Sequence, residues 1–400
     1  MSQRSTFKLF QPLATGSAFI EDVTELFRDS WNREALALGG DFRAAARFTG
    51  SDATLERWLD QNLAGRVVEN YGGLTAFEGL IWSITLVYNG LLIVKSLDTL
   101  FNKIAVYYSP SQGEPNTLTA FSSDADSVAA WGTRELLYRT TRYMSTSSAE
   151  ALRDKLLAEN KTPRAITAEL AAWEPGQRGT VGIEVMGYSR TLDWQHLNVP
   201  ITTAVTDDAS DEIADALSGA DFITAGAVST NTIQIREELD YRPAWQRIKE
   251  IAQAGDSSGD LWLAGCYQGR TLDYFEPTVT TPTYYVDVRK QDRGVFYDAA
   301  GNEIPAALVL PGRVVFARDI MGGLPLTDPL LDDPRSLFIE SLRYTAADNQ
   351  IRLRGANQQQ ARLAGLELAA VQALQKHKIQ AGSITTKKKG PGLALAGGRL

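Results

Sequence analysis

Residues 65–109 read GRVVENYGG (65–73), LTAFEGLIWSITLVYNG (74–90) and LLIVKSLDTLFNKIAVYYS (91–109), and they predict three consecutive antiparallel strands. Alternation with a period of two marks the middle segment as a half-buried strand. One face is expected to carry Leu80, Trp82, Ile84, Leu86 and Tyr88, and the other Ile81, Ser83, Thr85 and Val87. Asn89-Gly90 then predicts a tight type I′ hairpin, because this pair reaches positive φ at low cost.

Length and composition indicate a globular protein with more than one domain. Its 400 residues exceed what one core usually serves, so two or three packed domains are expected. The chain is 44% hydrophobic and 22% charged, which is ordinary for such proteins. A formal net charge of −8 argues against nucleic-acid binding as the main function.

The few cysteine and histidine residues limit the chemistry. Cys266 is the only cysteine, so no intrachain disulfide can form, and a buried small hydrophobe is favoured over a nucleophile. Together with His196 and His377 it cannot complete a Cys/His zinc site; carboxylate sites stay open, but no metal or cofactor is expected. The sequence shows neither the apolar core of a signal peptide nor a bilayer-spanning run, so synthesis in a cytoplasm without membrane insertion is expected.

The residues before the central unit predict further strands and one helix. The expected strands are one or two over 6–27 and a hairpin over 31–36 and 42–49 with its turn at 37–41. Ser51-Asp52 then begins a short capped helix. Its apolar stripe consists of Leu55, Trp58, Leu59 and Leu63.

The residues after the central unit predict a loop, several helices and a second set of strands. The loop runs from Ser109 to Ser127, and the capping box Ser147-Ser148-Ala149-Glu150 opens a helix that stops before Pro163. Further helices are expected over 208–217, from Pro243 to Gly255, and over 355–376. Strands are expected at 166–173, 180–186, 261–268, 271–277, 283–290, 307–319, 336–344 and 349–353.

Four pairs of adjacent carboxylates are candidates for a catalytic site. They are Asp207-Asp208, Asp211-Glu212, Glu237-Glu238 and Asp332-Asp333. Glycoside hydrolysis needs two carboxylates across a cleft. Helix N-termini and solvated loops explain adjacent acids at least as well. Because the sequence also has neither a G-x-S-x-G elbow nor a Walker A loop, no enzymatic activity is predicted.

Large aromatic side chains suggest an alternative function, that of a carbohydrate-binding or glycan-degrading β protein. The rings concerned are those of Trp194, Trp262, Tyr274 and Tyr285. A cleft lined by these rings with two carboxylates across it would favour that alternative, and burial of the rings would oppose it. Core and cross-strand packing is the interpretation we favour for the tyrosine-rich strands.

Several strings resemble the tail-hub or baseplate proteins of tailed phages and prophages, over most of residues 5–355. The strings are FEGLIWSITLVYNG, SLDTLFNKIAVYYS, GYSRTLDWQ, PAWQRIKEIAQAGD, LWLAGCYQGRTLDYFEP and VLPGRVVFARD. The type member is the hub of contractile-tailed phages, and the N-terminal part of siphophage tail-associated proteins is similar. The resemblance implies a mainly β fold of the α+β class, with two tandem antiparallel β-barrels, helical insertions and a C-terminal helix.

The resemblance also implies a domain plan. The domains are a first barrel over 1–109, a loop and helix insertion over 110–178, a second barrel over 179–354 with a helical insertion at about 207–256, and a helix and tail over 355–400. Some relatives carry a peptidase or lysozyme-like domain after the hub. Because a helix and a tail are predicted in that place here, no wall-degrading activity is expected.

The function implied is that of a structural virion protein in the tail, made in the host cytoplasm. It would join the tail tube to the receptor-binding apparatus and line the DNA ejection channel, as a homotrimer that offers quasi-sixfold symmetry to a hexameric tube. A six-copy distal-tail ring is the alternative within the same class. Expected partners are further copies of the chain, the tail tube or distal tail protein, receptor-binding or fibre proteins, and the tape measure protein. DNA would pass only in transit, and an acidic lumen would repel it.

The tail from Gly382 (GSITTKKKGPGLALAGGRL) is expected to contact an adjacent chain. Three lysines beside Gly and Pro are typical of a solvated tail or of one docked on an acidic partner. The expected assembly contacts are Lys387, Lys388, Lys389, Leu393, Leu395 and Leu400.

Overall fold

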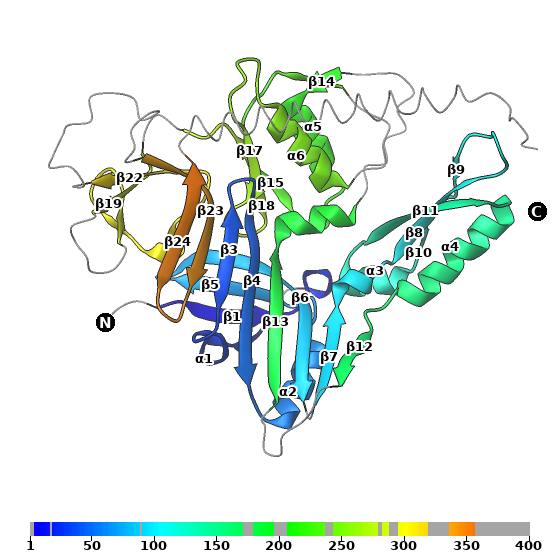
Figure 1. The fold of residues 1–400 in the computed structure, drawn as a ribbon, viewed down its shortest axis with the longest axis horizontal. Coiled ribbons are helices and arrows are strands. Elements are labelled where there is room, and N and C mark those ends of the chain that lie inside the picture. The colour runs from blue at the N-terminus through cyan, green and yellow to red at the C-terminus, as the bar shows by residue number, and fades with distance from the viewer. Residues whose placement is uncertain are drawn as a thin grey trace, which may run out of the picture.

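The computed structural model describes residues 4–16, 18–88, 90–170, 179–195, 206–236, 243–278, 282–287, 295–318 and 336–356. Within these residues the chain is a mainly β protein of the α+β class, as the sequence predicts. A large mixed sheet forms the body, and a smaller sheet with a long helix projects from one side (Figure 1). The two barrels and the domain boundaries stay predictions.

Eight strands of the body pair antiparallel, each with its neighbour in the order β24, β23, β3, β4, β13, β6, β7 and β12. Their bounds are β3 (Asn32–Leu36), β4 (Gly39–Thr49), β6 (Leu74–Tyr88), β7 (Leu91–Ser96), β12 (Ala165–Leu170), β13 (Thr180–Gly187), β23 (Ser336–Thr345) and β24 (Gln350–Ala356). The early hairpin and the last strand pair are confirmed. They also pair with each other through β3 and β23, which the sequence did not predict.

The long strand β6 serves two parts of the body. Its first half pairs with β5 (Arg66–Tyr71), which pairs with β1 (Thr6–Phe10), and β1 pairs with β2 (Phe19–Asp22). Its second half pairs with β7, so the three predicted antiparallel strands are confirmed for β5, β6 and β7. Tyr88 pairs with Leu91 across a two-residue turn; Gly90 has a φ of 80°, and Asn89 lies outside the described residues.

The prediction of one strand over 91–109 is wrong. β7 ends at Ser96, where η2 (Leu97–Thr99) begins, and β8 (Lys103–Ser109) belongs to the smaller sheet. The side chain of Ser96 accepts a hydrogen bond from the amide of Asp98 and so caps this turn. Leu97 is buried at the turn, which is why the apolar pattern continues across the break.

A β-bulge changes the predicted faces of β6. Glu184 pairs with Ser83 and Val185 pairs with Ile81, so the register shifts at Trp82. Ile183 pairs with Ile84, and since Ile183 and Val185 lie two apart, Ile81 and Ile84 share one face. Ile81 is therefore fully buried, whereas strict alternation assigned it to the face opposite Ile84.

The body core is built from large aromatic side chains. Phe7, Phe27, Trp31, Trp58 and Phe77 have no exposed surface. The rings of Phe27 and Trp31 stack with centroids 5.7 Å apart. Each such side chain stabilises the fold by roughly 1.5–3 kcal/mol through burial alone. The cluster therefore holds β1, β6 and the residue that precedes β3 together.

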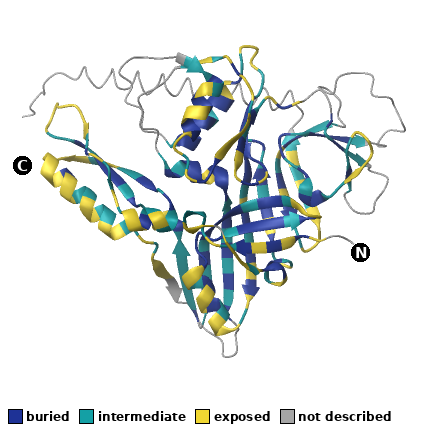
Figure 2. Ribbon diagram, turned by 180° about the vertical axis from the view of Figure 1, so that it is seen from behind, coloured by how far each residue is buried: buried dark blue, intermediate teal, exposed yellow. Residues whose placement is uncertain are grey.

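Residues 97–161 form the projecting unit, which we call the arm. Its elements are η2, β8, β9 (Thr117–Leu118), β10 (Ser122–Ser123), α3 (Ala125–Trp131), β11 (Glu135–Tyr143) and α4 (Thr146–Asn160). β11 pairs parallel with β8, and α4 packs on their sheet, with its outer face exposed along most of its length (Figure 2). The arm leaves and re-enters the body through β7 and β12, which pair with each other.

Four of the five predicted helices are confirmed, with changes at their starts. Ser51 caps α2 (Asp52–Gln61), and α5 (Ala209–Leu217) and α6 (Ala244–Ala254) lie where expected. α4 is capped by Ser145, whose side chain accepts from the amide of Ser148, so the predicted start at Ser147 is two residues late. The predicted loop over 109–127 contains β9, β10 and the start of α3.

The remaining strands build the other end of the body. They are β15 (Thr224–Val228), β17 (Leu263–Cys266), β18 (Thr271–Phe275), β19 (Tyr284–Asp287), β20 (Phe296–Tyr297), β21 (Glu303–Ile304) and β22 (Val314–Arg318), with β14 (Thr206–Asp208) and β16 (Gln234–Arg236) paired separately. The segment GYSRTLDWQ forms the 3₁₀ helix η3 (Tyr188–Trp194). Gly355 and Ala356 end β24, and the rest of the predicted helix over 355–376 lies outside the described residues.

Candidate assembly surfaces

Many of the predicted functional residues lie outside the part of the chain that the structure describes. These are Lys387, Lys388, Lys389, Leu393, Leu395 and Leu400, both histidines, and the pairs Glu237-Glu238 and Asp332-Asp333. The predicted contact of the tail with an adjacent chain therefore stays a prediction.

The aromatic residues of the glycan alternative are largely buried. Trp194 is 4% exposed, Trp262 is 6% exposed, and Tyr274 has no exposed surface. The rings of Trp262 and Tyr274 pack together with centroids 4.8 Å apart. Tyr274 also accepts a hydrogen bond from the Asn231 amide nitrogen at 2.8 Å. Three of the four rings are thus core residues, which opposes a sugar-stacking platform.

Three carboxylates of the described pairs, Asp208, Asp211 and Glu212, have structural roles. Glu212 is buried between α5 and α6 and forms an ion pair with Arg247, whose Nη2 lies 2.8 Å from its Oε2. Asp208 occupies the N-cap position of α5 and accepts a hydrogen bond from the Gln234 side chain. Asp211 lies in the first turn of α5, where the helix dipole favours an acid.

Cys266 is a buried residue of β17, as predicted. Burial raises the pKa of its thiol to about 12. Its backbone amide donates to the Ser189 Oγ at 3.1 Å. A thiol with so high a pKa is protonated at neutral pH and is a poor nucleophile.

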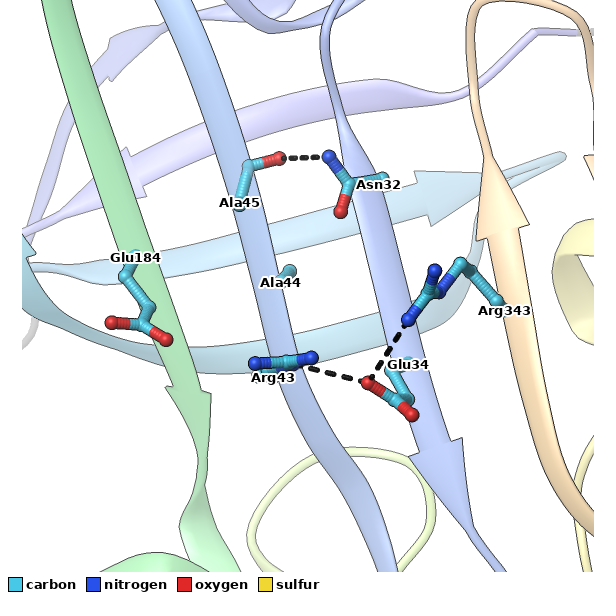
Figure 3. Close-up of a pocket in the computed structure, with 7 residues that line it drawn as sticks. All are labelled: Asn32, Glu34, Arg43, Ala44, Ala45, Glu184 and Arg343. Atoms are coloured by element: carbon cyan, nitrogen blue, oxygen red, sulfur yellow. Dashed lines mark hydrogen bonds and ion pairs between the residues drawn. The ribbon is translucent and has the colours of Figure 1, made fainter.

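A shallow pocket of about 340 Å³ lies on the open face of the body sheet (Figure 3). It is lined by Asn32, Glu34, Arg43, Ala44, Ala45, Glu184 and Arg343. The Oε2 of Glu34 lies 3.0 Å from Arg43 Nε and 3.8 Å from Arg343 Nη2. Both arginine side chains remain about half exposed, at 48% and 58%.

The chemistry of this pocket fits surface contact better than catalysis. Its two glutamates and two arginines come from four neighbouring strands, and Glu34 contacts both arginines (Figure 3). Such exposed pairs contribute little to stability, typically below about 1 kcal/mol. The pocket lining includes no Ser, Cys, His or Lys, and one of its two carboxylates, Glu34, is already held by two arginines.

A buried ionic cluster ties the beginning of the chain to its later strands. Arg33 Nε lies 3.1 Å from Glu69 Oε2, and its Nη2 donates to the carbonyl of Ala307. Glu69 also accepts from Trp31 Nε1 at 3.0 Å. Asp41 lies 4.0 Å from Arg33, and burial raises its pKa well above the usual value. This cluster specifies how the parts of the body meet.

A second buried cation, Arg134, anchors the arm. Its guanidinium lies over the rings of Trp194, Trp82 and Phe101, at 4.3, 5.1 and 5.7 Å from their centroids. Its Nη1 donates to the carbonyl of Leu97, and burial lowers its pKa to about 9. Desolvated cation–π contacts are worth about 2 kcal/mol or more, so this residue holds the base of the arm against β6 and η3.

The described residues show neither a metal site nor a membrane-spanning helix. No group of three or more His, Cys, Asp or Glu in the described ranges is arranged to hold a metal ion. No described helix is both long enough and apolar enough to cross a bilayer.

The arm, with its anchor, is the surface feature that the sequence did not reveal. The neighbours Trp82, Phe101 and Trp194 are spread over more than one hundred positions, so no local pattern joins them to Arg134. The run YRTTRY at 138–143, basic and aromatic in an acidic chain, was the available signal for an exposed strand.

No protein-family model and no curated protein matches this sequence. Among solved structures, the chain is similar to the tail protein from Neisseria meningitidis MC58, with 9% identity and a TM-score of 0.40 over 87% of this chain and 94% of that chain. It is similar to the 43 kDa tail protein of prophage MuSo2 from Shewanella oneidensis, with 9% identity and a TM-score of 0.40 over 86% and 92%. It is also similar to the prophage tail protein gp18 from Listeria monocytogenes EGD-e, with 8% identity and a TM-score of 0.33 over 90% and 98%.

Proposed function

We propose that this chain is a structural protein of a bacteriophage tail, without catalytic activity. It forms a hub or baseplate ring that joins the tail tube to the receptor-binding apparatus and lines the channel through which DNA passes. The proposal rests on the sequence resemblance given above. The similarity to the three solved tail proteins is not used as support for the proposal, because TM-scores of 0.33 to 0.40 do not establish a shared fold.

The structural observation that supports the proposal is the open face of the eight-stranded antiparallel run. Figure 1 shows no described helix across the middle of this face. Its small or neutral residues include Ala45, Ser83, Thr85 and Gly182, and its charged residues include Glu34, Glu184, Arg43, Arg47, Arg343 and Arg352, all exposed or half-buried. A solvated sheet face with mixed charge suits the wall of a water-filled channel. The two acids and four arginines named on this face do not supply the acidic lumen predicted from the net charge.

The resembling strings fall on elements that build the body and join it to the arm. FEGLIWSITLVYNG is most of β6 and its turn, PAWQRIKEIAQAGD is α6, and LWLAGCYQGRTLDYFEP is β17 and β18. These elements share one hydrophobic core. The resemblance thus concerns packing and turns, as expected for a protein whose function is to assemble.

The first experiment is native mass spectrometry of the purified chain over a concentration series. A trimer is the expected result for a hub, and negative-stain images should then show rings. Six copies would favour the distal-tail ring in its place. A chain that stays monomeric alone and also fails to join isolated tail tubes would contradict the proposal.

The predicted contact of the tail is tested separately by deleting residues 382–400. We expect the truncated chain to fold normally and to assemble more weakly. Circular dichroism and thermal unfolding provide the control for folding. Unchanged assembly would show that residues 382–400 are not part of the interface. The rest of the proposal would still stand.

A further inference from the structure

Exposed large hydrophobic side chains gather on strands with an unpaired edge. The described residues contain six of them: Phe19 at 55%, Ile20 at 40%, Leu74 at 61%, Tyr138 at 39%, Tyr143 at 59% and Ile166 at 53%. All except Leu74 lie on β2, β11 or β12. Among the described strands, β2 pairs only with β1, β11 only with β8, and β12 only with β7.

An unpaired edge that carries exposed aromatic residues is unusual in a protein that works alone. Natural sheets protect their edges with Lys, Pro, bulges or a covering element, because an open edge is a template for another strand. β11 is nine residues long and has neither Lys nor Pro. Its register against β8 shifts between Arg139 and Tyr143, and Tyr143 then pairs with Ser109. The other edge of β11 pairs with no described strand.

The exposed end of β11 is basic and aromatic. Arg139 and Arg142 are exposed between Tyr138 and Tyr143, and the exposed positions of the strand include no acid. Arg139 also lies over the ring of Tyr107, with 5.5 Å to its centroid. The surface that complements this strand is therefore acidic and apolar, although the chain itself carries a net charge of −8.

β2 has this complementary composition. Its sequence is FIED, with Phe19 and Ile20 exposed next to Glu21 and Asp22. Glu21 is held by Arg57 of α2 at 2.9 Å, and Asp22 accepts from the amide of Thr24 at 2.9 Å, so both carboxylates are fixed in place. β2 and the exposed end of β11 are both short, which suits the addition of one strand to another.

We propose that β11 of one copy adds to the free edge of β2 of the next copy, so that copies join head to tail. Backbone hydrogen bonds would provide affinity, and contact of Tyr143 with the exposed apolar residues of β2 would provide specificity. The arginines of β11 would lie near the acids of β2. This inference deepens the proposed function, on which it rests for the expectation of a ring.

Head-to-tail pairing has a structural consequence that self-pairing of β11 lacks. The two surfaces differ, so each copy offers one of each, and repeated pairing gives a closed ring when the rotation between copies allows it. An antiparallel pairing of two β11 strands about their exposed ends would instead place arginines opposite arginines. Like charges directly opposite each other destabilise a sheet.

The test uses two variants, each blocked on one surface only. The first carries Arg142→Glu and Tyr143→Ser on β11, and the second carries Phe19→Ser and Ile20→Arg on β2. Leu74→Ser is the matched control, because Leu74 is exposed to 61% and lies on neither edge. All five substitutions change exposed residues, so thermal unfolding should show that each variant remains folded.

Native mass spectrometry gives a distinct pattern for head-to-tail pairing. The unmodified chain and Leu74→Ser should form the same oligomer, whereas each blocked variant alone should be monomeric, with association weakened by about 30-fold or more. An equimolar mixture of the two blocked variants should form a heterodimer and nothing larger, because only one intact pair of surfaces remains.

Three results would overturn the inference. They are an unmodified chain that stays monomeric up to the highest concentration reached, a blocked variant that still assembles, and a mixture that forms no heterodimer. An oligomer that survives both blocks would overturn this interface while leaving the proposed tail function intact.

Discussion

The hydrophobic core of the body is much larger than that of the arm. Trp31, Trp58 and Phe27 have no exposed surface and contact one another through a continuous aromatic cluster. In the arm, Val106, Tyr108 and Ala149 are the buried members of a small cluster completed by half-buried residues of α4 and the preceding turn. Because stability follows buried apolar area, the body is expected to fold by itself, whereas the arm depends on its attachment to the body.

The largest effect is expected in the body. Trp31→Ala removes a ring that contacts Phe7, Phe27 and Phe77 and takes one donor from buried Glu69. The free energy of unfolding should fall by about 3–5 kcal/mol. Urea denaturation followed by circular dichroism measures it, with Trp31→Phe as the milder control. An equal loss for Tyr108→Ala, in the arm, would break the distinction between the two cores.

Loss of the anchor should affect the arm and spare the body. Arg134→Ala removes three ring contacts and the bond to the carbonyl of Leu97, so the arm should open with a local loss of about 2–3 kcal/mol. Hydrogen exchange should rise in 97–161 and stay unchanged in β3, β4 and β13. Arg134→Met keeps much of the packing volume and should show a smaller rise. Faster exchange throughout the body would contradict a separate arm.

The body should also respond to pH through Asp41. Burial raises its pKa well above the usual value, while Arg33 lowers it and Glu69 raises it further. The folded state therefore holds this proton to a higher pH than the unfolded state does. Stability should fall as pH rises from about 4 through the raised pKa, by about 1.4 kcal/mol for each unit of difference.

Asp41→Asn should remove that part of the pH dependence, because the amide resembles the protonated acid and cannot ionise. Chemical denaturation at a series of pH values gives the slope directly. Glu34→Gln, on the open face of the same sheet, is the matched control for replacing a carboxylate by an amide. An identical slope in Asp41→Asn and the unmodified chain would assign the dependence to other groups.

The smallest effects compare two helix caps. Ser51→Ala and Ser145→Ala each remove a side-chain acceptor at a helix N-terminus, at a cost of about 1 kcal/mol. For α2, which buries Leu55 and Trp58 in the body, the loss should appear in global unfolding. For α4 it should appear only as faster exchange in the arm. Ser147→Ala should have almost no effect, and a larger effect there than at Ser145 would restore the predicted cap.

Local patterns predicted local structure well. The hairpin of β6 and β7, the cap at Ser51 and the last strand pair follow from alternation and turn residues, which act over a few positions. The cap of α4 was misplaced because Ser145, Thr146, Ser147 and Ser148 are all able to cap. The break at Leu97 was missed because an apolar residue continues the strand pattern while turning into another part of the core.

Long-range contacts could not be predicted from one sequence. Arg33 donates to the carbonyl of residue 307, and Arg134 meets rings from Trp82 to Trp194, so the partners are set by the whole fold. The expected absence of a catalytic site came from missing motifs, and the burial of Trp262 and Tyr274 now opposes the glycan alternative on physical grounds. The predicted tail contacts lie beyond the described residues, so deletion remains their test.

The place where the arm enters the body has an evolutionary consequence. Lys95 and Ala165 are direct partners in an antiparallel pair, so everything between them leaves and returns at one point of the sheet. A short turn could close that pair, and a different insert could occupy it, without rearranging the strands on either side. Proteins built on this scaffold could therefore exchange this module to acquire new neighbours while keeping the same sheet.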